Sequence, residues 1–365
     1  MKMVVAVTGG GVQAISWLLT VPGASRTVLE CRVPYSGEAL REFLGFDPAQ
    51  AASQATAVAM ARASLARARL LAGPQAAVLG VGCTAALATD RPKRGEHRCH
   101  VAVADGATMT AWDLVFEKGR RSREEEDDLV SRLVLSGISS SVIAGNGVEI
   151  VLAPPESVTE SRVAEGDRLG ALLAGWTDMV VVNADGGLTD HLGAGTCVLP
   201  GSFNPVHEGH EGLARAASGE CHAESAFEIS VTNVDKPPLG RQTLDRRLKQ
   251  FSGRHTVVVT RAPTFAEKAR LMPGSVFVIG ADTAERLVDP EYYGGSPGGM
   301  LAALRVIRER RCRFIVAGRV RKGVFVTLDG ISIPAEFRDL FQQLPESEFR
   351  SDVSSTEIRK SLGQQ

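Results

Sequence analysis

Two histidines three residues apart, His207 and His210, are the side chains of this sequence that most directly suggest chemistry. They follow a short apolar segment and a glycine-containing turn, and they precede a segment, 211–217, whose pattern predicts a helix. This spacing would place both imidazoles on one face of the first helical turn. The free N–H groups of that turn and the positive end of the helix dipole favour the binding of phosphate. Because Gly201 lacks a Cβ, a ligand can also approach the backbone closely there, and we expect a polyphosphate site at this turn.

A zinc site is the alternative interpretation of the histidine pair, with Cys221 and His222 as further ligands. The spacing matches no common zinc motif. A zinc site would also leave Phe203 and Asn204 without a function. We therefore expect no protein-bound metal.

Strands and helices alternate along the chain from residue 196 onward. Short apolar segments predict strands, and helical patterns lie between them; the strands are expected at 196–199, 228–231, 256–260, 276–279 and 314–317, and the helices at 211–217, 242–251, 265–271 and 300–310. This alternation predicts an α/β domain with a Rossmann-like, doubly wound parallel sheet. Ligands of such sheets bind at the carboxyl ends of the strands, where the histidine pair would lie.

Four segments in order resemble the motifs of one enzyme family. Residues 201–210, GSFNPVHEGH, resemble the GxFxPxHxGH signature of the HxGH nucleotidyltransferases, the superfamily of the mononucleotide adenylyltransferases. Residues 277–283 resemble that family's strand ending in G-x-D, residues 314–319 its next strand ending in arginine, and residues 353–359 its ISSTxIR motif. Four ordered matches are far more specific than any one of them.

This resemblance implies attack of a mononucleotide phosphate on the α-phosphorus of ATP, with release of pyrophosphate. His207, His210 and Arg359 would be the catalytic residues, and Mg²⁺ would arrive with ATP. The residues expected to bind ATP or a small phosphorylated acceptor are Gly201, Ser202, Phe203, Asn204, Lys236, Asp282, Arg319, Ser354, Ser355 and Thr356.

Simpler structural roles are open for some of these residues. Ser354 and Glu357 also satisfy the capping-box pattern, although a capped helix start still binds anions. Asp282 could be a helix N-cap at the end of a strand. Lys236 could be a solvated lysine of a loop.

The acceptor is less well specified than the transfer reaction. Relatives in the resembled family stack the pyridine ring on a tryptophan of the catalytic domain, whereas all three tryptophans here precede residue 196. Tyr292 or Tyr293 could replace it, because any aromatic face can stack. Nicotinamide or nicotinate mononucleotide is the favoured acceptor; phosphopantetheine, a sugar phosphate or an alcohol phosphate are alternatives, as is a non-catalytic nucleotide-binding regulator.

Length, charge and composition limit the kinds of protein that this sequence can be. A chain of 365 residues suggests two domains, and its net charge of −1 argues against general nucleic-acid binding. No apolar run approaches the roughly 18 residues of a membrane span, and no signal-peptide pattern precedes the first predicted strand. The six cysteines form no CxxC pair, as expected for reduced thiols in a cytoplasmic protein.

Two composition breaks suggest the domain limits. They lie at 153–166 and 183–195, and we expect a first domain at 1–165, a linker of uncertain assignment at 166–195 and the nucleotidyltransferase domain at 196–365. In the first domain the pattern predicts a strand at 2–7, a helix at 12–20 and a long helix from Pro48, capped by Asp47, to Gly73.

The first domain resembles the CinA-type nicotinamide-mononucleotide deamidases. Segments 8–10, 21–25, 33–36 and 91–95 carry the resemblance. The family's expected nucleophilic serine is here Ala6, and its expected lysine is Leu40, so amide hydrolysis lacks its attacking group and its base. We expect an inactive domain that serves as a scaffold or holds a homo-oligomer together. Its fusion to an adenylyltransferase-like domain suggests a shared ligand, a pyridine mononucleotide.

Overall fold

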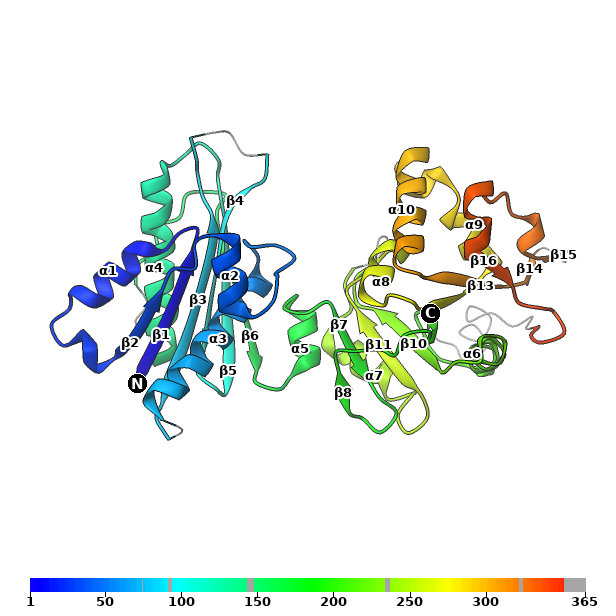
Figure 1. Cartoon of the computed structure of the whole chain (residues 1–365), viewed down its shortest axis with the longest axis horizontal. Coiled ribbons are helices and arrows are strands. Elements are labelled where there is room, and N and C mark those ends of the chain that lie inside the picture. The colour runs from blue at the N-terminus through cyan, green and yellow to red at the C-terminus, as the bar shows by residue number, and fades with distance from the viewer. Residues whose placement is uncertain (74, 91–93, 143–147, 234–236, 322–323, 351–365) are drawn as a thin grey trace. The chain divides into compact units, whose positions relative to one another are not determined.

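The chain forms two compact units, Met1–Trp176 and Thr177–Gln365, in a computed structural model (Figure 1). The structure describes all residues except 74, 91–93, 143–147, 234–236, 322–323 and 351–365. Each unit has its own sheet, so the two are described separately. Residues 166–195 are divided between them: α5 (Arg168–Leu173) belongs to the first unit, whereas β7 (Met179–Val182) and β8 (Leu188–Thr189) join the sheet of the second.

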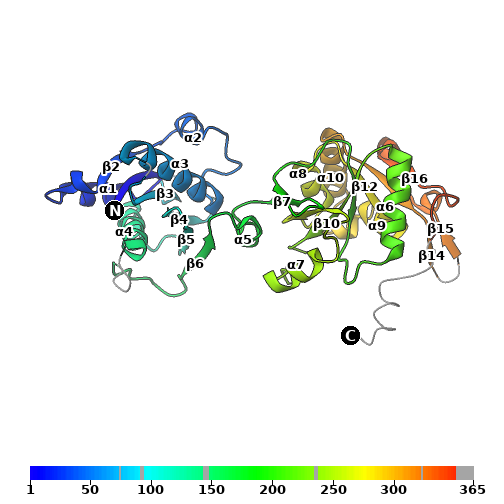
Figure 2. The ribbon, with the colours of Figure 1, turned by 90° about the horizontal axis from the view of Figure 1, so that it is seen from below.

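The first unit contains a six-stranded mixed sheet. Its strand order is β2 (Val28–Arg32), β1 (Lys2–Thr8), β3 (Val78–Ala86), β4 (His97–Ala104), β5 (Thr108–Phe116) and β6 (Val158–Ala164). The first three strands are parallel, and the other neighbouring pairs are antiparallel. In Figure 2, α2 (Gly37–Leu44) and α3 (Gln54–Ala72) lie on one side of these strands and α4 (Arg123–Val142) on the other. A shorter helix, α1 (Val12–Thr20), packs against α4.

The long helix α3 packs directly on the backbone of β3. A Cβ at Gly82 would lie 2.3 Å from the carbonyl oxygen of Ala57, so only glycine allows this approach. The predicted start of this helix at Pro48 was wrong, because α3 begins behind Ser53. The Thr84 hydroxyl donates to the Ala51 carbonyl at 2.8 Å and so holds it outside the helix, a contact that comes from a distant strand.

The second unit contains an eight-stranded sheet. Its order is β16 (Phe341–Gln343), β13 (Arg313–Ala317), β12 (Val276–Gly280), β9 (Cys197–Pro200), β10 (Ser225–Ser230), β11 (Thr256–Thr260), β7 and β8. The strands from β16 to β11 are parallel, and β7 pairs antiparallel with β11. Numbered along the chain, the parallel strands follow the order 6-5-4-1-2-3 of a doubly wound dinucleotide-binding sheet. The predicted Rossmann-like fold is therefore confirmed, with an antiparallel edge that the sequence pattern did not indicate.

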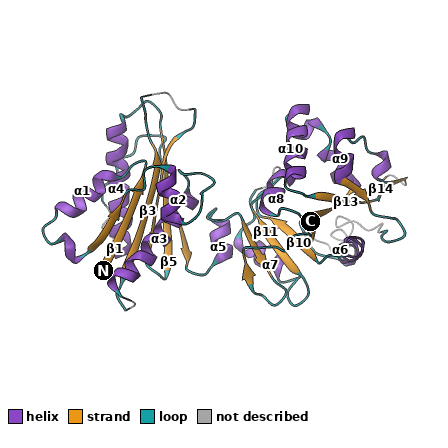
Figure 3. Cartoon of the chain, in the orientation of Figure 1, coloured by secondary structure: helices purple, strands orange, loops and turns teal. Residues whose placement is uncertain are grey.

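Helices follow the parallel strands of the second unit in the expected alternation, as the purple and orange ribbons of Figure 3 show. They are α6 (Glu208–Cys221), α7 (Arg241–Leu248), α8 (Phe265–Leu271), α9 (Ala281–Leu287) and α10 (Pro297–Glu309). A two-stranded ribbon, β14 (Arg319–Arg321) and β15 (Val324–Val326), follows β13. Within the described part of the chain, no helix combines the length and apolar character that a membrane span requires.

A buried ion pair lies inside the second unit. The Glu228 side chain on β10 is 1% exposed, and its Oε1 contacts Lys268 Nζ at 2.6 Å and accepts the Thr260 hydroxyl at 2.5 Å. Lys268 is itself buried. Because each charge is removed from water, the side chain that remained after loss of its partner would carry an uncompensated charge.

Candidate active site

The histidine motif lies at the switch point of the doubly wound sheet. Strands β9 and β12 are parallel neighbours, yet β9 is the first and β12 the fourth of the parallel strands along the chain. The carboxyl end of β9 is followed by the loop 201–207, and that of β12 leads directly into α9, which begins at Ala281. Ligands of such sheets bind in the crevice at this point. The fold therefore brings together two of the four motifs that the sequence separates by about 75 residues.

The loop after β9 is anchored to the sheet by its backbone and by one ring. The N–H of Gly201 donates to the carbonyl of Glu228 at 2.9 Å. The ring of Phe203 lies against Gly201, where a Cβ would come within 2.6 Å of it. Phe203 is buried and packs edge-to-face with Phe227 and Phe251 at 5.2 and 5.4 Å between ring centroids. The buried Phe203 ring therefore anchors the loop to the core, and it is not exposed to a ligand.

Ser202 and Asn204 flank Phe203 and are exposed. Of the predicted ligand-binding residues in this loop, these two side chains and the backbone around Gly201 are the ones accessible to a phosphate. The Phe203 backbone itself has φ 44°, in the left-handed region that a bulky side chain rarely adopts.

His207 and His210 form the first turn of α6. His207 is the N-cap residue, and the two residues form a capping box in which the His207 N–H donates to His210 Nδ1 at 3.3 Å. Their rings are stacked, with centroids 3.7 Å apart and an interplanar angle of 28°. The predicted placement of both imidazoles on one face of the turn is what the structure shows.

Burial keeps both histidines neutral. Burial, together with the neighbouring His207, lowers the pKa of His210 to about 4, and burial also lowers the pKa of His207. Because Nδ1 of neutral His210 accepts the backbone N–H, its ring proton is on Nε2. His210 is thus a neutral hydrogen-bond donor at the positive end of a helix dipole, which suits an oxygen that gains negative charge.

Asp282 and Arg319 are paired with each other. Arg319 Nη1 lies 2.9 Å from Asp282 Oδ2, and both side chains are substantially exposed. Gly280, not Asp282, is the N-cap residue of α9, so the capping role considered for Asp282 is wrong. The pair links the segments that follow β12 and β13, the second and third motifs of the sequence.

The other predicted phosphate ligands lie outside the described residues. They are Lys236, Ser354, Ser355, Thr356 and Arg359. The described chain ends at Arg350, just after Phe349, whose ring would lie 3.2 Å from a Cβ at Gly212. Since Gly212 is in the second turn of α6, the chain reaches the histidine-bearing helix directly before the ISSTxIR-like segment.

The zinc alternative conflicts with the geometry of α6. His207 caps the start of this 14-residue helix, and Cys221 and His222 stand at its end. At 1.5 Å per residue the two ends are about 20 Å apart, so these residues cannot share an ion. Within the described residues no group of three or more potential metal ligands occurs elsewhere either.

In the first unit, the two positions that the CinA resemblance assigns to the nucleophile and the base lie in an apolar cluster. Ala6, Leu40 and Met60 are buried against one another, with Phe43 and Leu44 packed around them. The space that a nucleophile and a base would need is therefore filled by hydrocarbon.

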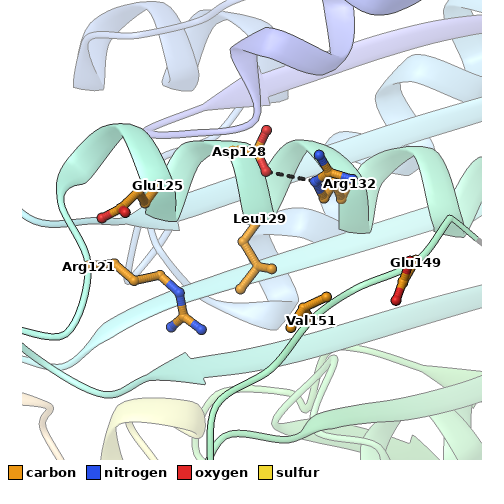
Figure 4. Close-up of a pocket in the computed structure, with 7 residues that line it drawn as sticks. All are labelled: Arg121, Glu125, Asp128, Leu129, Arg132, Glu149 and Val151. Atoms are coloured by element: carbon orange, nitrogen blue, oxygen red, sulfur yellow. Dashed lines mark hydrogen bonds and ion pairs between the residues drawn. The ribbon is translucent and has the colours of Figure 1, made fainter.

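A shallow groove lies along α4 of the first unit (Figure 4). It has a volume of about 430 Å³ and is lined by Arg121, Glu125, Asp128, Leu129, Arg132, Glu149 and Val151. Arg132 is paired with Asp128 at 2.7 Å, and Arg121 with the Glu156 carboxylate at 2.5 Å. Because both arginines are already paired, the groove lacks the free cations that a phosphate site needs. No sequence motif had indicated it.

Sequence comparison supports a nucleotidyltransferase-like unit. No family model matches the chain. It is 27% identical over 179 residues to a Gloeobacter violaceus protein described as "probable nicotinate-nucleotide adenylyltransferase", an alignment that covers 45% of this chain and 82% of the relative. The resemblance of residues 1–165 to CinA-type deamidases gains no support and stays a prediction. The chain is thus a two-unit α/β protein with distant homology to a nicotinate-nucleotide adenylyltransferase.

Proposed function

We propose that the second unit transfers AMP from ATP, bound as its magnesium complex, to the phosphate of a mononucleotide. One observation carries the proposal: a stacked pair of neutral histidines begins α6 at the switch point of a doubly wound sheet. A site built only for binding would have no need of a desolvated pair of neutral donors.

In this reaction an oxygen of the acceptor phosphate attacks the α-phosphorus of ATP. The bond between the α-phosphorus and the bridging oxygen to the β-phosphorus breaks, and pyrophosphate leaves. The protein's own contribution is positioning and charge stabilisation. His210 Nε2–H would donate to an α-phosphoryl oxygen, and His207 with the first N–H groups of α6 would hold the neighbouring oxygens.

Cations for the outer phosphates would come from the later motifs. We propose that Arg359, with the N–H groups around Ser355 and Thr356, holds the β- and γ-phosphates, and that Lys236 is a second cationic contact. The position of Phe349 beside α6 supports this, because the described chain lies against the histidine-bearing helix just before this motif begins. Arg319 would bind phosphate by giving up its exposed ion pair with Asp282 for one with a phosphate oxygen.

Nicotinate or nicotinamide mononucleotide is the acceptor that we propose. The description of the distant relative as a probable nicotinate-nucleotide adenylyltransferase supports a pyridine mononucleotide. Tyr292 supplies an exposed aromatic face, 59% accessible, between α9 and α10, with the Arg286 guanidinium 5.6 Å from its ring centroid. Tyr293 is less suited to stacking, because it packs against the core and its hydroxyl donates to the Leu287 carbonyl at 3.0 Å.

The acceptor can be identified by pyrophosphate release. The whole chain with ATP and Mg²⁺ should release pyrophosphate on addition of nicotinate or nicotinamide mononucleotide, and the dinucleotide should accumulate in equal amount. Pyrophosphate release only with phosphopantetheine or with a sugar or alcohol phosphate would support the transfer reaction but contradict the proposed acceptor. Binding of ATP without release for any acceptor would favour a non-catalytic regulator.

For the first unit, we infer that amide hydrolysis is absent. The apolar cluster of Ala6, Leu40 and Met60 supports this, because neither an attacking group nor a base lies there. Ammonia release from nicotinamide mononucleotide by the whole chain, above a heat-denatured control, would contradict the inference.

A further inference from the structure

Gln250, two residues after α7, reaches the histidine loop from another part of the chain. Its Nε2 donates to the carbonyl of Phe203 at 3.1 Å, and its Oε1 accepts the N–H of Val206 at 2.9 Å. A second donated bond, to the Arg247 carbonyl at 3.2 Å, fixes the amide to the end of α7. A primary amide carries a donor and an acceptor on one planar group, so a single side chain holds both ends of the segment 203–206.

This segment has a conformation that needs support. Phe203 has φ 44°, and a bulky residue in that region is an outlier that persists only when its surroundings hold it. The rings of Phe227 and Phe251 hold the Phe203 side chain. The bond from Gln250 holds its carbonyl, which is the backbone group that leads into the rest of the loop.

The same amide is one peptide away from the histidines. The Val206 N–H bonds to Gln250, and the next N–H along the chain, that of His207, bonds to His210 Nδ1. Two consecutive N–H groups therefore link Gln250 to the ring of His210. A change in the orientation of the 206–207 peptide would break the bond from the His207 N–H to His210 Nδ1. The His210 proton would then no longer be confined to Nε2.

We propose that Gln250 is a positioning residue of the second unit, whose amide holds the segment 203–206 so that His207 and His210 face the phosphates. The proposal rests on the transferase function inferred above. Gln250 is not assigned a contact with substrate: its two polar side-chain atoms bond to the loop and to the Arg247 carbonyl of α7.

Replacement of Gln250 tests this role through kinetics. Gln250→Met keeps the length of the side chain and removes both bonds to the loop. A misplacement of about 1 Å can cost roughly 10²-fold in rate, so we expect kcat to fall about 10- to 100-fold. The KM for ATP should change less than about threefold, because the helix N-terminus still binds phosphate in the ground state. Gln250→Glu retains an acceptor for the Val206 N–H and should recover part of the lost kcat.

Gln242→Met is the matched control, since Gln242 is an exposed glutamine of α7, the helix that directly precedes Gln250. It should keep the wild-type kcat. All rates refer to the folded fraction, measured by thermal denaturation, and Gln250→Glu takes the place of Gln250→Met if the latter fails to fold.

A second measurement is independent of activity. ¹⁵N NMR of labelled histidine reports which ring nitrogen of His210 carries the proton. We expect a single Nε2–H tautomer in the wild type and a mixture in Gln250→Met. If the wild type transfers no nucleotide, the proposed function fails while this measurement still tests Gln250. A folded Gln250→Met with a kcat within twofold of wild type, or with the unchanged single tautomer, would overturn the positioning role.

Discussion

Replacing His210 by asparagine would isolate the donor that the transfer reaction requires. The asparagine side-chain oxygen can take the place of Nδ1 and accept the His207 N–H, so the cap of α6 is retained. The Nε2–H that would face the phosphate is lost. Removal of one preorganised donor to a developing negative charge lowers kcat by roughly 10²–10³-fold, about 3–4 kcal/mol. We expect a loss of this size in His210→Asn.

The KM for ATP should change much less than kcat in this variant. Ground-state binding of the phosphates is shared with the N–H groups of α6 and with the cations of the later motifs. The effect is measured by steady-state pyrophosphate release over a range of ATP concentrations, with saturating acceptor.

His222→Asn provides the matched control at the other end of α6. His222 is the C-cap residue, with φ 51°, a conformation that asparagine adopts more readily than most residues. This variant should keep the wild-type kcat. A kcat of His210→Asn within about threefold of wild type would refute the assignment of His210 as a transition-state donor.

Three further predictions concern pH, the core and the acceptor. Because the pKa of His210 is lowered to about 4, the unfolded chain binds the proton first; the free energy of unfolding should fall as pH drops from 6.5 towards 4, and His210→Asn should show a shallower fall in urea titrations. Lys268→Met leaves the Glu228 carboxylate buried without its partner and should cost about 3–5 kcal/mol in urea unfolding, most of which adding Glu228→Gln should restore. Tyr292→Ala should raise the KM for the pyridine mononucleotide and leave that for ATP unchanged; equal KM values in mutant and wild type would exclude stacking on this ring.

The parts of the fold that depend on local pattern were predictable from sequence. The apolar segment at β9, the turn and the start of α6 are adjacent in the chain, so periodicity and the glycine and proline positions indicated them. The predicted start of α3 was wrong, because the Thr84 hydroxyl that holds the Ala51 carbonyl outside the helix comes from a strand 33 residues later.

The same limit applies to the site. The histidine pair was found from its spacing, whereas Gln250 was missed, since its partners Phe203 and Val206 are 47 and 44 residues away and a glutamine near a helix end carries no sequence signal. The pairing of Arg319 with Asp282 likewise depends on the sheet placing β12 beside β13.

Transfer of label from ATP tests the central claim most directly. ATP labelled at the α-phosphate is incubated with nicotinate mononucleotide, Mg²⁺ and either the wild-type chain or the double variant His207→Ala, His210→Ala. The wild type should move the label into the dinucleotide, with one pyrophosphate released for each label transferred, and the double variant should lose at least 10²-fold of that rate while staying folded. Label transfer at an equal rate in the folded double variant would contradict a transferase site at the start of α6.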